Sequence, residues 1–129
     1  MITIDEMQEL LDEIAEEFPR EFFNELSGGI VLVNRAKRGA EDGLLTMGEY
    51  IRGGGLGRYI AIYYGSFAQV YGHLSQSAMK EQLRETLSHE FTHHLESMAG
   101  VRDLEIEDER QLEEFRRRKK NHPKGYPMP

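Results

Sequence analysis

The chain has 129 residues, no cysteine and a net charge of -7 at pH 7. Its length suits a single domain, and with 39% hydrophobic residues it is too apolar to be disordered. A disulfide framework is excluded, and the acidic charge argues against nucleic-acid binding, which needs a surplus of Lys and Arg. There is no secretory signal at the start and no apolar run long enough to span a bilayer, so we expect no membrane contact and a cytoplasmic location.

Two helices are predicted at the N-terminal end. Thr3 and Glu6 have the spacing of a capping box, so the first helix should begin at about Ile4. Its apolar residues recur at helical spacing: Met7, Leu10, Leu11, Ile14 and Phe18. Pro19 ends this pattern and can open a second, short helix that closes at the glycines of residues 28–29. The apolar residues of the second helix are Phe22, Phe23 and Leu26.

Two strands are predicted in the middle of the chain, where β-branched and aromatic residues cluster. They run from Ile30 to Val33 and from Arg58 to Tyr64. The glycine-rich segment between them leads into a strand, whereas a phosphate-binding loop opens a helix. We therefore expect a mobile loop or an irregular hairpin there, and a short mixed or antiparallel sheet.

A long helix is predicted from Ser75 or Ser77 to about Met98 or Ala99, ending at Gly100. One side of this helix is apolar and carries Leu83, Leu87, Phe91 and Met98. Another side carries His89, His93 and Glu96. The helix is therefore expected to have a core face and a separate ligand face.

The ligand face contains a His-Glu-x-x-His motif, residues 89–93. His89 and His93 are one helical turn apart, where two imidazoles can bind one metal ion, and Glu90 lies beside them as a base for metal-bound water. With no cysteine available, these ligands favour Zn²⁺. The neighbouring His94 falls in the apolar sector and is predicted to be a buried, hydrogen-bonded histidine.

A catalytic zinc ion commonly has three protein ligands, so a carboxylate is expected to complete the site. Asp103 follows Gly100, where the chain can reverse, and is the first candidate, although an aspartate there can equally cap a final helix. Glu96 is a second candidate that would otherwise orient a ligand imidazole, and Glu107 is a third.

The C-terminal region is predicted to form a last helix that holds Leu112 and Phe115. Residues 1–120 are expected to be one domain and residues 121–129 a frayed tail. The basic run that begins at Arg116 is interpreted as the solvated end of this helix, in preference to a docking segment.

At this point the sequence resembles the minimal zincins, small zincin-like metallopeptidases found in bacteria. The resemblance covers most of the chain and depends on residues 18–22, 48–50, 55–64 and 89–94, with the doubled His93 and His94 as its most specific detail. It implies a zincin-like α+β domain with N-terminal helices, a short sheet, a long active-site helix and a C-terminal helix.

The family motif usually continues as His-Glu-x-x-His-x-x-Gly-x-x-Asp, and its Asp is taken as the third ligand. Here Gly100 to Asp103 supplies Gly-x-x-Asp, but residues 94–99 separate His93 from Gly100 where the family has two. His89, Glu90 and His93 correspond directly, and the resemblance implies Asp103 as the remaining ligand.

The expected function is that of a zinc-dependent hydrolase, a metallopeptidase acting on a peptide or protein substrate with Glu90 as general base. The substrate would pair with the strand Arg58 to Tyr64 if that strand is the sheet edge. Tyr63 and Tyr64 are expected to pack in the core in preference to stabilising an oxyanion. The alternative is a non-catalytic interaction domain that a bound metal stabilises.

Overall fold

The computed structural model describes residues 1–101, 114, 115 and 117. Helix α1, Ile4–Ala15, begins where it is predicted to begin. The Glu6 N–H donates to Thr3 Oγ1 at 3.1 Å, and the Thr3 N–H donates to Glu6 Oε1 at 2.7 Å. The second helix is only a 3-10 turn, η1, Arg20–Phe23. The chain leaves helical geometry at Asn24, which has a ψ of 130°, and Glu25 follows with a φ of 65°, in the left-handed region.

The main sheet has three strands in the order β1, β5, β4, namely Gly29–Val33, Tyr59–Tyr63 and Gly48–Ile51. β1 is parallel and β4 antiparallel to β5, so the sheet is mixed. β5 lies in the centre, and its residues Ile60, Ala61, Ile62 and Tyr63 are all buried because neighbours cover both of its faces. The condition for a substrate to pair with this strand is therefore not met, because β4 and β1 are the edges of the sheet.

The glycine-rich segment is more ordered than predicted. It forms a small hairpin, in which β2, Lys37–Arg38, pairs with β3, Leu45–Thr46, and it also contains the edge strand β4. A Cβ atom added to Gly48 would lie 2.7 Å from Thr86 Cγ2. The glycine thus allows this edge strand to approach the helix that carries Thr86.

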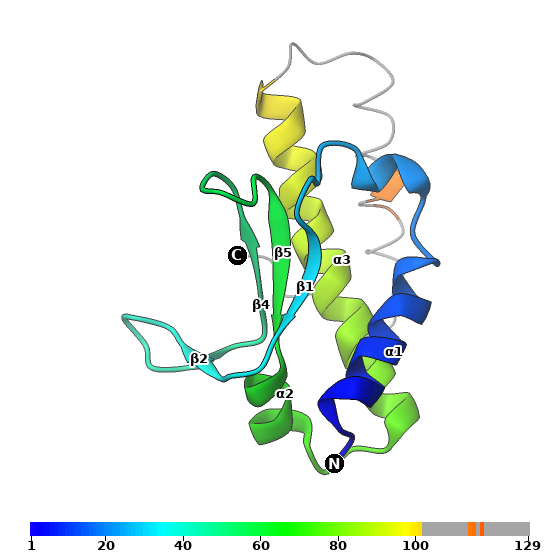
Figure 1. Cartoon of the computed structure of the whole chain (residues 1–129), viewed down its shortest axis with the longest axis vertical. Helices are drawn as coiled ribbons and strands as arrows, with labels where there is room; N and C mark the ends of the chain where they lie inside the picture. Colours follow the sequence, from blue (N-terminus) through cyan, green and yellow to red (C-terminus); the bar gives the residue numbers. More distant parts are fainter. Residues whose placement is uncertain (102–113, 116, 118–129) are drawn as a thin grey trace.

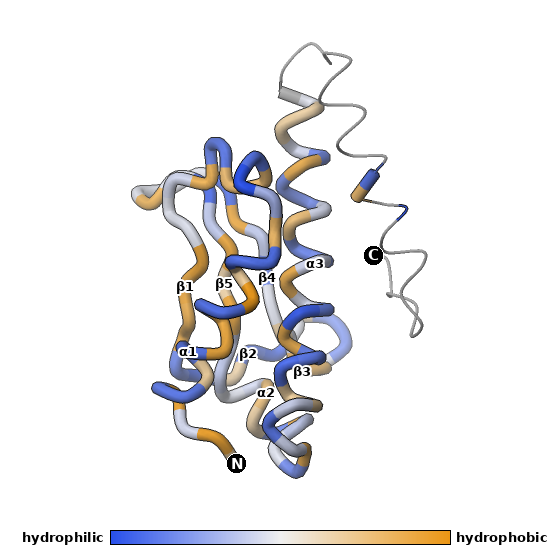
Figure 2. Tube along the Cα trace, turned by 90° about the vertical axis from the view of Figure 1, so that its right-hand side faces the viewer, coloured by the Kyte–Doolittle hydropathy of each residue, from blue (hydrophilic) through white to orange (hydrophobic). Residues whose placement is uncertain are grey.

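Two helices follow the sheet. α2, Tyr64–Tyr71, was not predicted and begins where the strand was expected to continue, whereas α3, Gln76–Val101, confirms the predicted long helix. α3 packs along β4 and β5 and against α1 (Figure 1). Seen from the side, the sheet and α3 form two adjacent layers with apolar residues between them (Figure 2).

Residues of the C-terminal region are described at three positions, all helical. Phe115 is helical, as predicted, and it lies in the core: it is 4% exposed and its ring centroid lies 4.9 Å from that of Phe22. Leu112, the remainder of the predicted last helix and the tail of residues 121–129 lie outside the described residues. No helix in the described part of the chain combines the length and apolar character of a membrane span.

Candidate metal centre

The orientation of α3 about its own axis is set by its apolar residues. The side chain of Ser75 caps the helix by accepting a hydrogen bond from the Ala78 N–H at 3.2 Å. The apolar side chains at Met79, Leu83, Leu87 and Phe91 are at most 1% exposed. Around Phe91, ring centroids lie 4.8 Å away for Phe18 and 5.0 Å away for Phe23. This packing holds the opposite side of α3 towards β4 and solvent.

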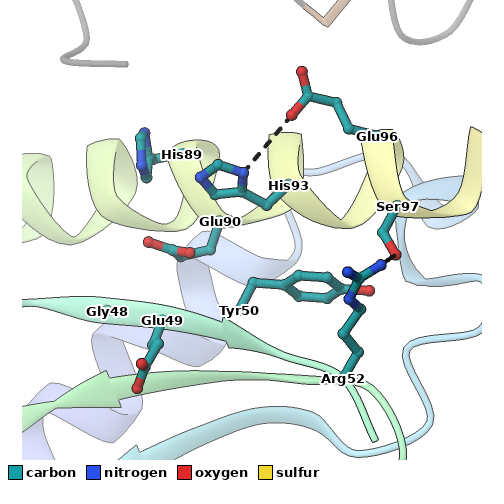
Figure 3. A pocket seen from close by; sticks show the side chains of 9 residues that line it. All are labelled: Gly48, Glu49, Tyr50, Arg52, His89, Glu90, His93, Glu96 and Ser97. Carbon is teal, nitrogen blue, oxygen red and sulfur yellow. Dashed lines mark hydrogen bonds and ion pairs between the residues drawn. The ribbon is translucent and has the colours of Figure 1, made fainter. Parts of the chain in front are cut away.

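His89 and His93 lie side by side on that other side of α3, as predicted. Their ring centroids are 4.8 Å apart and their ring planes are at 89° (Figure 3). Both side chains line the same cleft and are partly exposed. Two imidazoles this close on one helical face match the donor set of a zinc site, in which each ring would supply one nitrogen atom.

Glu90 extends from α3 towards β4 and lines the same cleft (Figure 3). Its side chain is only 6% exposed, although the cleft beside it is open to solvent. A carboxylate next to two histidines, in a wall shielded from bulk water, has the position expected of a base that acts on a neighbouring water molecule.

Glu96 interacts with His93 from the following turn. The distance from Glu96 Oε1 to His93 Nδ1 is 3.7 Å, within ion-pair range but longer than a hydrogen bond. The position agrees with the predicted orienting role and leaves His93 Nε2 as the ring nitrogen for a metal.

His94 confirms the prediction of a buried, hydrogen-bonded histidine. It is 0% exposed, its Nε2–H donates to the Asn24 carbonyl at 2.8 Å, and its Nδ1 accepts from the Tyr50 hydroxyl at 2.8 Å. Burial lowers the pKa of His94, so the ring is neutral near pH 7. Through Tyr50 this histidine connects α3 to β4, which forms the facing wall of the cleft.

The cleft between α3 and β4 has a volume of about 580 Å³. Its lining residues are Gly48, Glu49, Tyr50, Arg52, His89, Glu90, His93, Glu96 and Ser97. The Glu49 side chain itself points away from α3 and accepts hydrogen bonds from Lys37 Nζ at 2.6 Å and from the Tyr63 hydroxyl at 2.7 Å (Figure 3). Glu49 therefore contributes its backbone to the wall of the cleft, while its carboxylate points away from the cleft.

Several cleft residues were not predicted as part of the site. Tyr50, Arg52 and Ser97 reach it through the pairing of β4 with β5 and its packing on α3, and no local spacing in the sequence indicates either contact. Tyr63 and Tyr64 do not line the cleft; the Tyr64 hydroxyl donates to the Ile2 carbonyl at 2.6 Å.

The third ligand is not found among the described residues. No group of three His, Asp or Glu side chains within residues 1–101, 114, 115 and 117 is arranged to hold a metal ion, which leaves Glu96 outside such a group. Asp103 and Glu107 lie outside the described residues.

The described elements define a small α+β domain with an N-terminal helix, a small mixed sheet and a long helix. The chain is similar to the solved structure of a conserved hypothetical protein, TTHA0227, from Thermo thermophilus. The two are 35% identical, with a TM-score of 0.69, over 78% of this chain and 100% of that one. The chain belongs to the same family as that protein, whose description states no function. No family model matches the chain, and no curated protein is similar to it.

Proposed function

We propose that this protein is a zinc-dependent hydrolase, specifically a metallopeptidase of the minimal zincin type. One observation carries the proposal: His89, Glu90 and His93 share a cleft that is bounded by an edge strand of the sheet. The same cleft brings together metal donors, a shielded base and a strand edge. If the two histidines lay on this helix face by chance, there would be no reason for a shielded carboxylate and a strand edge to lie beside them.

The residues present suit zinc. His89 and His93 supply two imidazoles with ring centroids 4.8 Å apart, and the carboxylate of Asp103 is the proposed third ligand. Asp103 is two residues beyond Val101, the last residue of α3. Glu96 would hold the His93 ring through Nδ1.

The chemistry that zinc supplies when bound is a coordinated water with a pKa lowered to about 7 and a polarised substrate carbonyl. Glu90 would accept a proton from the attacking water in the cleft and would pass it to the leaving amine as the peptide bond breaks. The burial of Glu90 keeps its carboxylate aimed into the cleft and limits competition from bulk water.

The substrate peptide is proposed to bind along β4. Among the residues that the structure describes, this strand pairs with β5 on one side only, so the backbone groups of its other edge are available to an extended peptide. β4 also lines the cleft next to Glu90, which would bring a peptide on this edge close to the proposed metal. The edge strand β4 thus takes the role first expected of Arg58 to Tyr64.

The test is peptide hydrolysis by the full chain loaded with zinc, measured over a library of fluorogenic peptides. We expect Glu90→Gln to lower kcat by about 100-fold to 10,000-fold while zinc stays bound, because only the base is lost. Glu81→Gln is the matched control, since Glu81 lies on the same helix away from the cleft and pairs with Arg84. If the wild type cleaves no peptide, the enzyme proposal fails and a metal-stabilised interaction domain takes its place.

A further inference from the structure

Two arginines converge on Ser97 at one end of the cleft. Arg52 Nη1 donates to Ser97 Oγ at 3.2 Å, and Arg58 Nη1 donates to the same oxygen at 2.5 Å. Arg52 follows the end of β4, is exposed and lines the cleft, and its side chain lies beside Ser97 in Figure 3. Arg52 therefore supplies a guanidinium to the end of the cleft beyond His93, where Glu96 lies 3.7 Å from the His93 ring.

This end of the cleft is held in place by hydrogen bonds. Arg58 Nη1 also donates to the Tyr50 hydroxyl at 2.9 Å, and Tyr50 in turn bonds His94 in the core. Arg58 is partly buried and does not itself line the cleft. Arg58 thus positions Ser97 and Tyr50, and Arg52 is the guanidinium that a ligand in the cleft would meet.

Neither arginine has a carboxylate partner in the described part of the chain. Within residues 1–101, 114, 115 and 117, no Asp or Glu lies at ion-pair distance from Arg52 or Arg58. Other cations of this chain do have one, as Lys80 has Glu13 at 2.8 Å and Arg84 has Glu17 at 2.7 Å. The chain as a whole has a net charge of -7, yet no acid among the described residues pairs with Arg52. The Arg52 guanidinium therefore has N–H donors available for the carboxylate of a ligand.

We propose that Arg52 binds a carboxylate of the substrate, so that acidic peptides are the preferred substrate class. The proposal rests on the proposed function above. Ser97 is one helical turn beyond His93, about 6 Å along the axis, and an extended peptide advances about 3.3 Å per residue. The carboxylate therefore belongs within about two residues of the cleaved bond, as an acidic side chain or as the peptide's C-terminus.

The experiment compares matched peptides on the zinc-loaded full chain. One arm replaces Asp or Glu by Asn or Gln at each position near the cleaved bond, and the other arm compares free with amidated C-termini. We expect kcat/KM to favour one carboxylate form by about 10-fold to 100-fold, mainly through KM, and Arg52→Gln to remove that preference. Arg52→Lys should keep part of it, because the charge remains.

Arg38→Gln is the matched control, because Arg38 is an exposed cation on β2 that donates to the Gly43 carbonyl outside the cleft. Equal kcat/KM of the wild type in both arms, for acidic against neutral side chains and for free against amidated C-termini, would overturn the Arg52 subsite and leave the hydrolase proposal intact. If no peptide is cleaved, the same peptides are labelled with fluorescein and their affinity for zinc-loaded Glu90→Gln is measured, which tests the Arg52 subsite independently of hydrolysis. Equal affinity for the peptides with and without the carboxylate, in both arms, would overturn the subsite.

Discussion

The two sides of α3 place histidines in opposite environments. His93 lies on the cleft side, partly exposed, with Glu96 as an ion-pair neighbour at 3.7 Å. The next residue, His94, is 0% exposed and bonds the Asn24 carbonyl and the Tyr50 hydroxyl. One residue step rotates a side chain by about 100° around a helix, which is enough to move it from solvent to core. Position around the axis therefore decides which histidine can bind a ligand and which one supports the fold.

The largest expected effect is on the core side. Phe91→Ala should lower the free energy of unfolding by about 3–5 kcal/mol, because Phe91 is 0% exposed and packs against Phe18, Phe22 and Phe23. Urea denaturation of the metal-free protein measures this, with Phe91→Leu as the milder control. A loss under about 1 kcal/mol would mean that Phe91 does not set the orientation of α3.

The second prediction separates the adjacent histidines. His94→Ala should cost about 1–3 kcal/mol of unfolding free energy, since it leaves the Asn24 carbonyl and the Tyr50 hydroxyl without this partner. His93→Ala, the matched control, should change stability by less than about 0.5 kcal/mol in metal-free protein. Both are measured in EDTA, so that metal binding does not contribute. Equal losses for the two variants would contradict the division between the two sides.

The smallest effect is expected at the contact between α1 and α3. A hydrogen bond from Arg84 lowers the pKa of Glu17, so the associated stability is present above the ordinary carboxyl pKa and is lost as pH falls through the lowered value. Glu17→Gln should cost less than about 1 kcal/mol at pH 7, because the pair is exposed to solvent. Urea midpoints of variant and wild type should converge as the pH falls from the ordinary carboxyl pKa through the lowered pKa of Glu17. A difference that stays constant over that pH range would show that the ion pair is not the cause.

Features that depend on nearby residues were predicted well. The start of α1 follows from Thr3 and Glu6, which satisfy each other's backbone groups across a single turn. The burial of His94 and its separation from the face that carries His89 and His93 follow from helical periodicity within α3. These relations span only a few residues, so the sequence contains all of the information that they require.

Features that depend on distant residues were not predicted. Gly48–Ile51 begins with Gly48 and Glu49, which are residue types depleted in strands, and the strand is stabilised by its pairing with β5 and its packing on α3. Whether β5 is central or an edge is decided by β1 and β4 together, which no single segment reveals. Arg52 enters the cleft for the same reason, because its place depends on where β4 ends.

We propose that His89 and His93 bind zinc, and the zinc content of the purified full chain is the decisive test of this proposal. Elemental analysis after equilibration with zinc and removal of the excess should give about one zinc per chain for the wild type. His89→Ala and His93→Ala should each reduce this content to near zero while remaining folded. A wild type without stoichiometric zinc, or a His89→Ala variant that keeps its zinc, would contradict the proposed metal site.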